Sequence, residues 1–169
     1  MFRFSSSHLP LVLLLSLISC AAPHQTVAPP EQMELGPVDR SFMMKPEYQA
    51  FAVTYDTAQV SADVVELIRM AQSDAEFLVF FGSWCGDSKR EVPRFMKIAD
   101  RAGIPAERLR LEGLDRAKQS PDGLAGGYDI VRVPTFIVLR GGKEVGRIVE
   151  HPVGTLEGDL LNILAQQNR

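Results

Sequence analysis

Cysteine, tryptophan and histidine are scarce in this chain. Its 169 residues include two cysteines, one tryptophan and three histidines. Exported domains that depend on disulfides carry a larger, even set of cysteines, so this chain is not of that class. Structural zinc sites need clustered cysteine and histidine ligands, and His24 and His151 lie far apart in the sequence. We therefore expect no disulfide framework and no metal site.

Clustered basic residues are also lacking. The formal net charge is −3, and nucleic-acid binding depends on patches of Lys and Arg that neutralise phosphates. The glycines form no phosphate-binding pattern, and we expect no cofactor and no nucleic-acid partner. A hydrophobic content of 46% is enough for a buried core, and a chain of this length favours one folded domain.

Acidic residues are absent from the first thirty positions, where Leu9 to Ile18 form an almost unbroken apolar run. The run is about half as long as the roughly 20 residues that a transmembrane helix needs. This pattern therefore predicts a secretory signal peptide. The sequence LISC at its end resembles the lipobox of bacterial lipoproteins. That resemblance implies a signal peptide over 1–19 and lipidation of Cys20; an ordinary signal peptide is the alternative.

We expect a proline-rich tether over 20–45 and a folded domain over 46–169. If lipid occupies Cys20, Cys85 is the one remaining thiol. The resemblance to lipoproteins implies a chain anchored in a bacterial envelope membrane and facing the periplasm. Ala21 follows the lipidated position where enterobacterial inner-membrane lipoproteins carry Asp, which favours the outer membrane.

The order of the expected strands and helices predicts an α/β fold for the domain. Alternation predicts a strand over 48–55, and apolar residues at helical spacing, Val64, Leu67, Ile68 and Ala71, predict a helix that begins after Ser61. The apolar run 77–81 predicts a buried strand. The later elements are a helix over 87–103 that contains Pro93 and stops at Gly103, a strand over 108–114, a polar connection over 117–127, a hairpin around Gly141 and Gly142, and a helix after Thr155.

The residues around Cys85 resemble the thioredoxin superfamily. Trp84, Cys85 and Gly86 follow the apolar strand as in that family's redox motif, and Pro93 stands where the family kinks its active-site helix. Val133, Pro134 and Thr135 are similar to its cis-proline loop, which implies a cis bond and a role in binding clients. The resemblance implies a thioredoxin-like fold, a central mixed β-sheet flanked by helices.

The position of Cys85 suits a reactive thiol. Free N–H groups and the positive dipole at a helix start stabilise a thiolate, which is the nucleophilic form. Lys89 and Arg90 add positive charge, whereas the carboxylate of Asp87 disfavours a second anion. The alternative for Cys85 is a buried structural cysteine. Trp84 could belong to the core or to a surface that binds clients. His151 suggests a further alternative, a cysteine hydrolase with Cys85 as the nucleophile, which we favour less.

Ser88 stands where a dithiol enzyme would carry its second cysteine. Its hydroxyl can donate a hydrogen bond to a thiolate but cannot form a disulfide. Val79 replaces a buried acid that many thioredoxins carry six residues before the cysteine. We therefore predict a monothiol exchanger, a possible oxidoreductase, that forms mixed disulfides with cysteine-containing exported proteins or small thiols and needs an external thiol reductant. The alternative is a non-catalytic binding or chaperone-like module for polypeptides.

Overall fold

The computed structural model describes residues 32–166. Its helices and strands, in chain order, are β1 (Gly36–Val38), η1 (Arg40–Met44), η2 (Pro46–Tyr48), α1 (Gln49–Thr57), α2 (Ala62–Ala71), β2 (Ala75–Phe81), α3 (Gly86–Ala102), η3 (Ala106–Arg108), β3 (Leu109–Gly113), α4 (Leu124–Gly127), β4 (Thr135–Arg140), β5 (Lys143–Val149) and α5 (Leu156–Ala165). Signal peptide, lipobox and Cys20 lie outside the described residues.

The five strands form one mixed sheet in the order β1-β3-β2-β4-β5. β2 and β3 are parallel, and the other neighbouring strands are antiparallel. β2 occupies the centre and carries the longest apolar run of the five strands, FLVFF, as expected of a strand that is covered on both faces. The predicted α/β fold with a central mixed sheet is confirmed.

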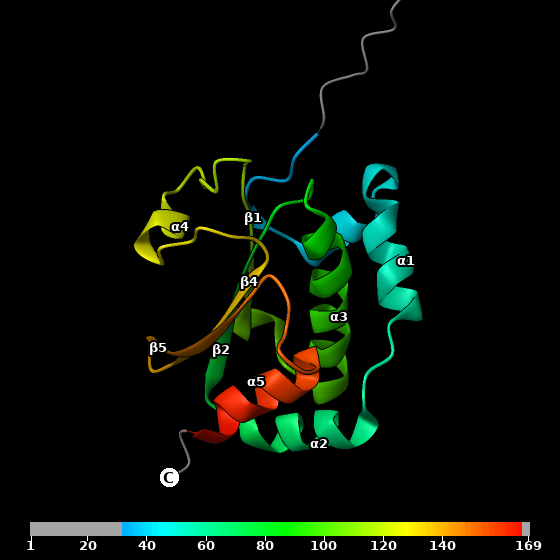
Figure 1. Ribbon diagram of the computed structural model, residues 1–169, viewed down its shortest axis with the longest axis vertical. Coiled ribbons are helices and arrows are strands. Elements are labelled where there is room, and N and C mark those ends of the chain that lie inside the picture. Colours follow the sequence, from blue (N-terminus) through cyan, green and yellow to red (C-terminus); the bar gives the residue numbers. More distant parts are fainter. Residues whose placement is uncertain (1–31, 167–169) are drawn as a thin grey trace, which may run out of the picture. The chain divides into compact units, whose positions relative to one another are not determined.

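Helices cover the two faces of the sheet unequally (Figure 1). Residues of α1, α2, α3 and α5 share one core with Phe77, Val79 and Phe81 of β2. The other face is covered by α4 and the loops beside it, which pack on Phe80 and Ile137. Side chains alternate between the two faces of a strand, so β2 contributes to both cores.

Several predicted elements are confirmed together with their caps. α3 contains Pro93 and ends at Gly103, whose left-handed φ of 68° makes it a glycine C-cap. Gly141 and Gly142 both have positive φ at the β4–β5 turn, as a two-residue type I′ hairpin requires. Thr155 caps α5 by accepting a hydrogen bond from the Gly158 amide.

The strand predicted over 48–55 is wrong, because this segment is η2 followed by the helix α1. Tyr48, Phe51 and Tyr55 recur every three or four residues and turn inward together, with Phe51 fully buried. Strand alternation would place Val53 on the same face as Phe51, whereas the helix turns Val53 to the opposite side, where it is half exposed. The packing of Phe51 against Phe42 of η1 and Phe81 of β2 therefore favours a helix over a strand in this segment.

The buried face of α2 is also shifted from the predicted one. Val65 and Ile68 are buried, whereas the predicted Leu67 is 46% exposed. Ser61 is the N-cap residue, but its side chain makes no capping hydrogen bond. Its backbone amide instead donates to the buried carboxylate of Glu157 on α5, so this distant contact fixes how α2 begins.

The folded domain begins before residue 46, so the expected end of the tether at 45 is too late. β1 pairs with β3 through Gly36, Pro37 and Val38, and η1 buries Phe42 and Met43 in the main core. Proline content suggested a tether, but Pro37 lies on an edge strand, where a missing N–H costs little.

Candidate active site

Cys85 lies at the junction between the central strand and the longest helix. β2 ends at Phe81, and a turn closed by the Cys85 amide donating to the Gly82 carbonyl (2.9 Å) leads into α3. Cys85 is the N-cap residue of α3, with φ −84° and ψ 130°, and it is half-buried. Its sulfur therefore stands at the positive end of the helix dipole and is open on one side.

The cis-proline loop contacts this sulfur. The Val133–Pro134 peptide bond is cis, and the Cys85 thiol donates a hydrogen bond to the Val133 carbonyl oxygen at 3.3 Å. The Thr135 hydroxyl donates to the Arg132 carbonyl (2.8 Å) and fixes the loop. The structure thus brings together Cys85 and the loop 133–135, which are 48 residues apart at the thiol contact.

Ser88 has a different partner from the one predicted. It is fully buried, and its hydroxyl oxygen accepts a hydrogen bond from the Gly82 amide at 3.2 Å. Within the described residues no hydrogen bond joins Ser88 to the Cys85 sulfur. Ser88 therefore holds the turn that precedes Cys85, while Gly86 beside it is exposed.

Most of the charged side chains that follow Cys85 on α3, over residues 87–94, form ion pairs with one another. The Asp87 carboxylate accepts a hydrogen bond from Arg90 at 2.7 Å, and Arg90 also binds Glu91, which raises the pKa of Arg90 above its ordinary value. Glu91 is buried and is held further by Arg94 at 3.2 Å. Because Asp87 is paired, it opposes a thiolate less than the sequence suggested. Lys89 makes no ion pair within the described residues.

Trp84 forms one wall of the site. Its side chain is partly buried and packs against the core that contains Phe80 and Ile137. Its indole N–H donates to the Leu114 carbonyl oxygen at 3.0 Å, and Arg116 and Lys118 lie 4.9 Å and 5.6 Å from its ring centroid. The sequence reasoning missed both cations because they lie about thirty residues further on, in a segment that reads only as a polar connection.

The missing buried acid is not replaced from a neighbouring strand. Val79 is fully buried in the core beneath α3 and pairs in register with Leu111 of β3. The buried acid Glu112 pairs with Phe80, so it faces the opposite side of the sheet. Burial raises the pKa of Glu112, and Arg110 binds it at 2.9 Å. Glu112 therefore cannot serve Cys85 from the position of Val79.

The alternative chemistries find no support in the part of the chain that the structure covers. His151 is exposed, and no contact joins it to Cys85. In residues 32–166 no group of three or more His, Cys, Asp or Glu side chains could hold a metal ion. The same residues include no helix with the length and apolar character needed to cross a membrane.

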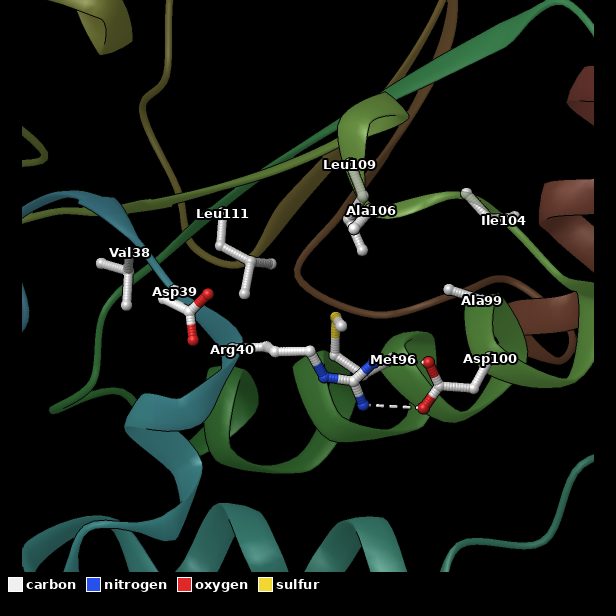
Figure 2. Close-up of a pocket in the computed structure, with 10 residues that line it drawn as sticks. All are labelled: Val38, Asp39, Arg40, Met96, Ala99, Asp100, Ile104, Ala106, Leu109 and Leu111. Atoms are coloured by element: carbon white, nitrogen blue, oxygen red, sulfur yellow. Dashed lines mark hydrogen bonds and ion pairs between the residues drawn. The ribbon is translucent and has the colours of Figure 1, made fainter.

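A separate cavity of about 230 Å³ lies far from the thiol, between β1, α3 and β3. Figure 2 shows Arg40 reaching over Met96 to Asp100 at its edge. Met96 and Ala99 line this cavity and follow Cys85 by 11 and 14 residues along the helix, which corresponds to about 16–21 Å. The cavity is therefore not part of the Cys85 site.

Comparison with known proteins agrees with this geometry. The chain is 30% identical over 76 residues to a thioredoxin-like protein of Acanthamoeba polyphaga mimivirus, which covers 44% of this chain and 53% of that protein. It is 28% identical over 79 residues to the chloroplastic thioredoxin Y of Oryza sativa subsp. japonica, covering 46% and 44%. The chain thus spans about half the length of these curated relatives.

Among solved structures, a protein of unknown function from Pseudomonas aeruginosa is similar with a TM-score of 0.52 and 18% identity, over 70% of this chain and 83% of that one. This likeness concerns the fold alone. The sequence model of the thioredoxin family matches residues 41–158, more than half of the chain. With the half-buried cysteine before α3 and the cis-proline loop against it, the chain belongs to the thioredoxin family.

Proposed function

We propose that the protein exchanges thiols and disulfides through Cys85 alone and depends on an external thiol to complete each cycle. The observation that carries this proposal is the half-buried Cys85 sulfur at the start of α3, 3.3 Å from the Val133 carbonyl. Ser88 occupies the place of a second sulfur and is buried against Gly82. Membership of the thioredoxin family supports thiol-disulfide redox chemistry.

The proposed exchange has two balanced steps. The Cys85 thiolate attacks one sulfur of a client disulfide, forms a Cys85–client disulfide and releases the other sulfur as a thiolate. An external thiolate then attacks the client sulfur, takes it as a new disulfide and frees the Cys85 thiolate. Because residue 88 is serine, no neighbouring sulfur on the helix can perform the second step.

A non-catalytic module that binds polypeptides is the second candidate. It is favoured by an apolar side chain that is exposed beside the cis-proline loop. The side chain of Val131, three residues before the cis proline, is 75% exposed and offers an apolar contact. The two candidates differ in whether Cys85 reacts.

We further propose that lipid on Cys20 anchors the protein in a bacterial envelope membrane, with the domain facing the periplasm. The support is the apolar run that ends in LISC, followed by a proline-rich stretch. Clients would then be exported proteins with cysteines, or small thiols. The outer membrane is favoured over the inner one because Ala21, not Asp, follows Cys20.

Reaction with dithiodipyridine tests the exchange. We expect the chain from residue 21 onward to release one equivalent of thiopyridone and keep a mixed disulfide until a thiol is added. Ser88→Cys should release a second equivalent without added thiol, because the introduced thiol then attacks the sulfur of Cys85. Cys85→Ser should release none. A wild-type protein that releases none at the pH where a free cysteine reacts would refute exchange and support the binding module.

A further inference from the structure

Trp84 presents one fixed face beside Cys85. The indole N–H is held by the Leu114 carbonyl at 3.0 Å. A Cβ atom added at Gly82 would lie only 2.6 Å from the ring, so the glycine permits the ring to pack directly on the backbone. The indole of the residue next to Cys85 therefore has little freedom to move.

The loop that carries Arg116 and Lys118 is also held in one conformation. The Asp115 amide donates to the Gln119 carbonyl at 3.1 Å, and the Gln119 amide donates back to the Asp115 carboxylate at 2.8 Å. Lys118 has a φ of 63°, which a non-glycine residue adopts only when its surroundings fix it. Its ammonium lies 5.6 Å from the Trp84 centroid. The loop thus holds cations over the indole.

Within residues 32–166, no carboxylate pairs with Lys118 or with Lys89. The Lys118 ammonium donates to the Arg116 carbonyl oxygen at 2.9 Å, not to a carboxylate. Lys89, one turn beyond Cys85 on α3, forms no ion pair within residues 32–166. Arg116 makes a further contact, so we take the unpaired positive charge to be that of Lys89 and Lys118.

The nearby acids are engaged elsewhere. Asp87 binds Arg90 at 2.7 Å, and the Asp115 carboxylate caps its own loop. Glu150 binds Arg132 beside the cis-proline loop at 2.8 Å. We call Lys89 and Lys118 the basic rim. The basic rim places positive charge on both sides of Cys85, along the helix and over Trp84.

We propose that the thiols which react at Cys85 carry a carboxylate close to their sulfur, and that the basic rim recognises this carboxylate. The inference rests on the proposed exchange and names the substrate class of the same site. When the carboxylate-bearing thiolate attacks the Cys85 mixed disulfide, the new disulfide forms on the client sulfur and Cys85 leaves as a thiolate. The cations attract the attacking anion and stabilise the two negative charges that meet there.

The test compares two thiols that differ only in this charge. Cys85 is loaded as its uncharged thiopyridyl mixed disulfide, and thiopyridone release is timed with N-acetylcysteine and with its amide. The rate for each thiol is expressed per thiolate. For wild type we expect a ratio in favour of the carboxylate, which falls as ionic strength rises because exposed charges are screened.

Lys89→Gln with Lys118→Gln should lower that ratio by about two- to tenfold, the effect of losing two partly exposed attractions. Lys143→Gln is the matched control, because Lys143 is exposed at the far end of the β4–β5 hairpin. β4 separates that turn from the cis-proline loop by about 20 Å. The control should keep the wild-type ratio. An unchanged far-UV circular dichroism spectrum verifies that each variant is folded.

A second pair of probes distinguishes the source of the carboxylate. Two cysteine peptides, one flanked by Glu and the other by Gln, are compared in the same assay. A preference for Glu without one for N-acetylcysteine assigns the basic rim to polypeptide clients. Equal rates within both pairs, or a preference that survives the double variant, would overturn the inference. Failure of Cys85 to form the initial mixed disulfide would instead contradict the proposed exchange.

Discussion

At the scale of single residues, the replacement of cysteine by Ser88 changes both chemistry and structure. Its hydroxyl accepts from the Gly82 amide at the end of β2, an interaction that a thiol would make more weakly. The serine therefore stabilises the turn that presents Cys85 while removing the internal resolving sulfur. In the proposed exchange, the same serine would leave the second step to an external thiol.

Asp100 is a second residue whose contribution can be measured. Arg40 donates to both of its carboxylate oxygens, at 2.6 Å and 2.7 Å, and the Tyr55 hydroxyl donates at 2.6 Å. Burial alone would raise the pKa of Asp100, but these hydrogen bonds outweigh it, so the pKa lies below the ordinary 3.8. Its stabilising effect is therefore complete above that pH and is lost as the pH falls through the folded-state pKa.

We expect Asp100→Asn to lower the free energy of unfolding by about 1 kcal/mol at neutral pH, a modest value because the side chain is one-third exposed. Urea denaturation at a series of pH values measures it. The difference from wild type should vanish in strong acid. Asp56→Asn, on the exposed side of α1, is the control and should change stability by less than about 0.5 kcal/mol. A loss that is constant with pH would contradict the ionic origin.

At the scale of elements, η1 ties the start of the domain to its core. Phe42 of η1 stacks on Phe81 of β2 at 5.0 Å and meets Phe51 of α1 edge-on at 5.1 Å. β1 adds three paired residues at the edge of the sheet beside β3. Gly113 permits this approach, because a Cβ there would lie 2.2 Å from the Glu34 carbonyl oxygen. The segment before α1 is thus structural.

Phe42→Ala should destabilise the domain by about 3–5 kcal/mol, the usual cost of emptying a buried phenylalanine site. Met44→Ala in the same element is the matched control. Met44 is 72% exposed, so its loss should stay within about 0.5 kcal/mol. Thermal or urea unfolding compares the two. Similar small effects for both would show that residues before 46 act as the tether first expected.

At the scale of the whole molecule, the proposed lipid on Cys20 would confine the chemistry of Cys85 to a membrane surface. In bacterial cells supplied with a labelled fatty acid, we expect the wild-type chain to carry the label and to sediment with membranes. Cys20→Ala should lose both, whereas Cys85→Ala should keep both. Label retained by Cys20→Ala would exclude lipidation at this residue.

The sequence by itself determined the parts of the protein whose signals are local. The apolar run of β2, the period of α3, the Gly141–Gly142 turn and the Thr155 cap each lie within a few residues, and all are confirmed. The place of Cys85 before a helix follows from the same signals. The cis state of Pro134 came from the family resemblance, because local sequence alone favours a trans bond.

Only the tertiary structure decided the rest, because it depends on contacts between distant residues. Packing against Phe42 and Phe81 made 49–57 a helix, although its alternation suited a strand. Burial against Gly82 turned the Ser88 hydroxyl away from the sulfur. The Leu114 carbonyl, 30 residues beyond Trp84, accepts the hydrogen bond that fixes the indole, and the loop after Leu114 places Lys118 over the ring. No local pattern specifies such contacts, since each depends on the fold being formed.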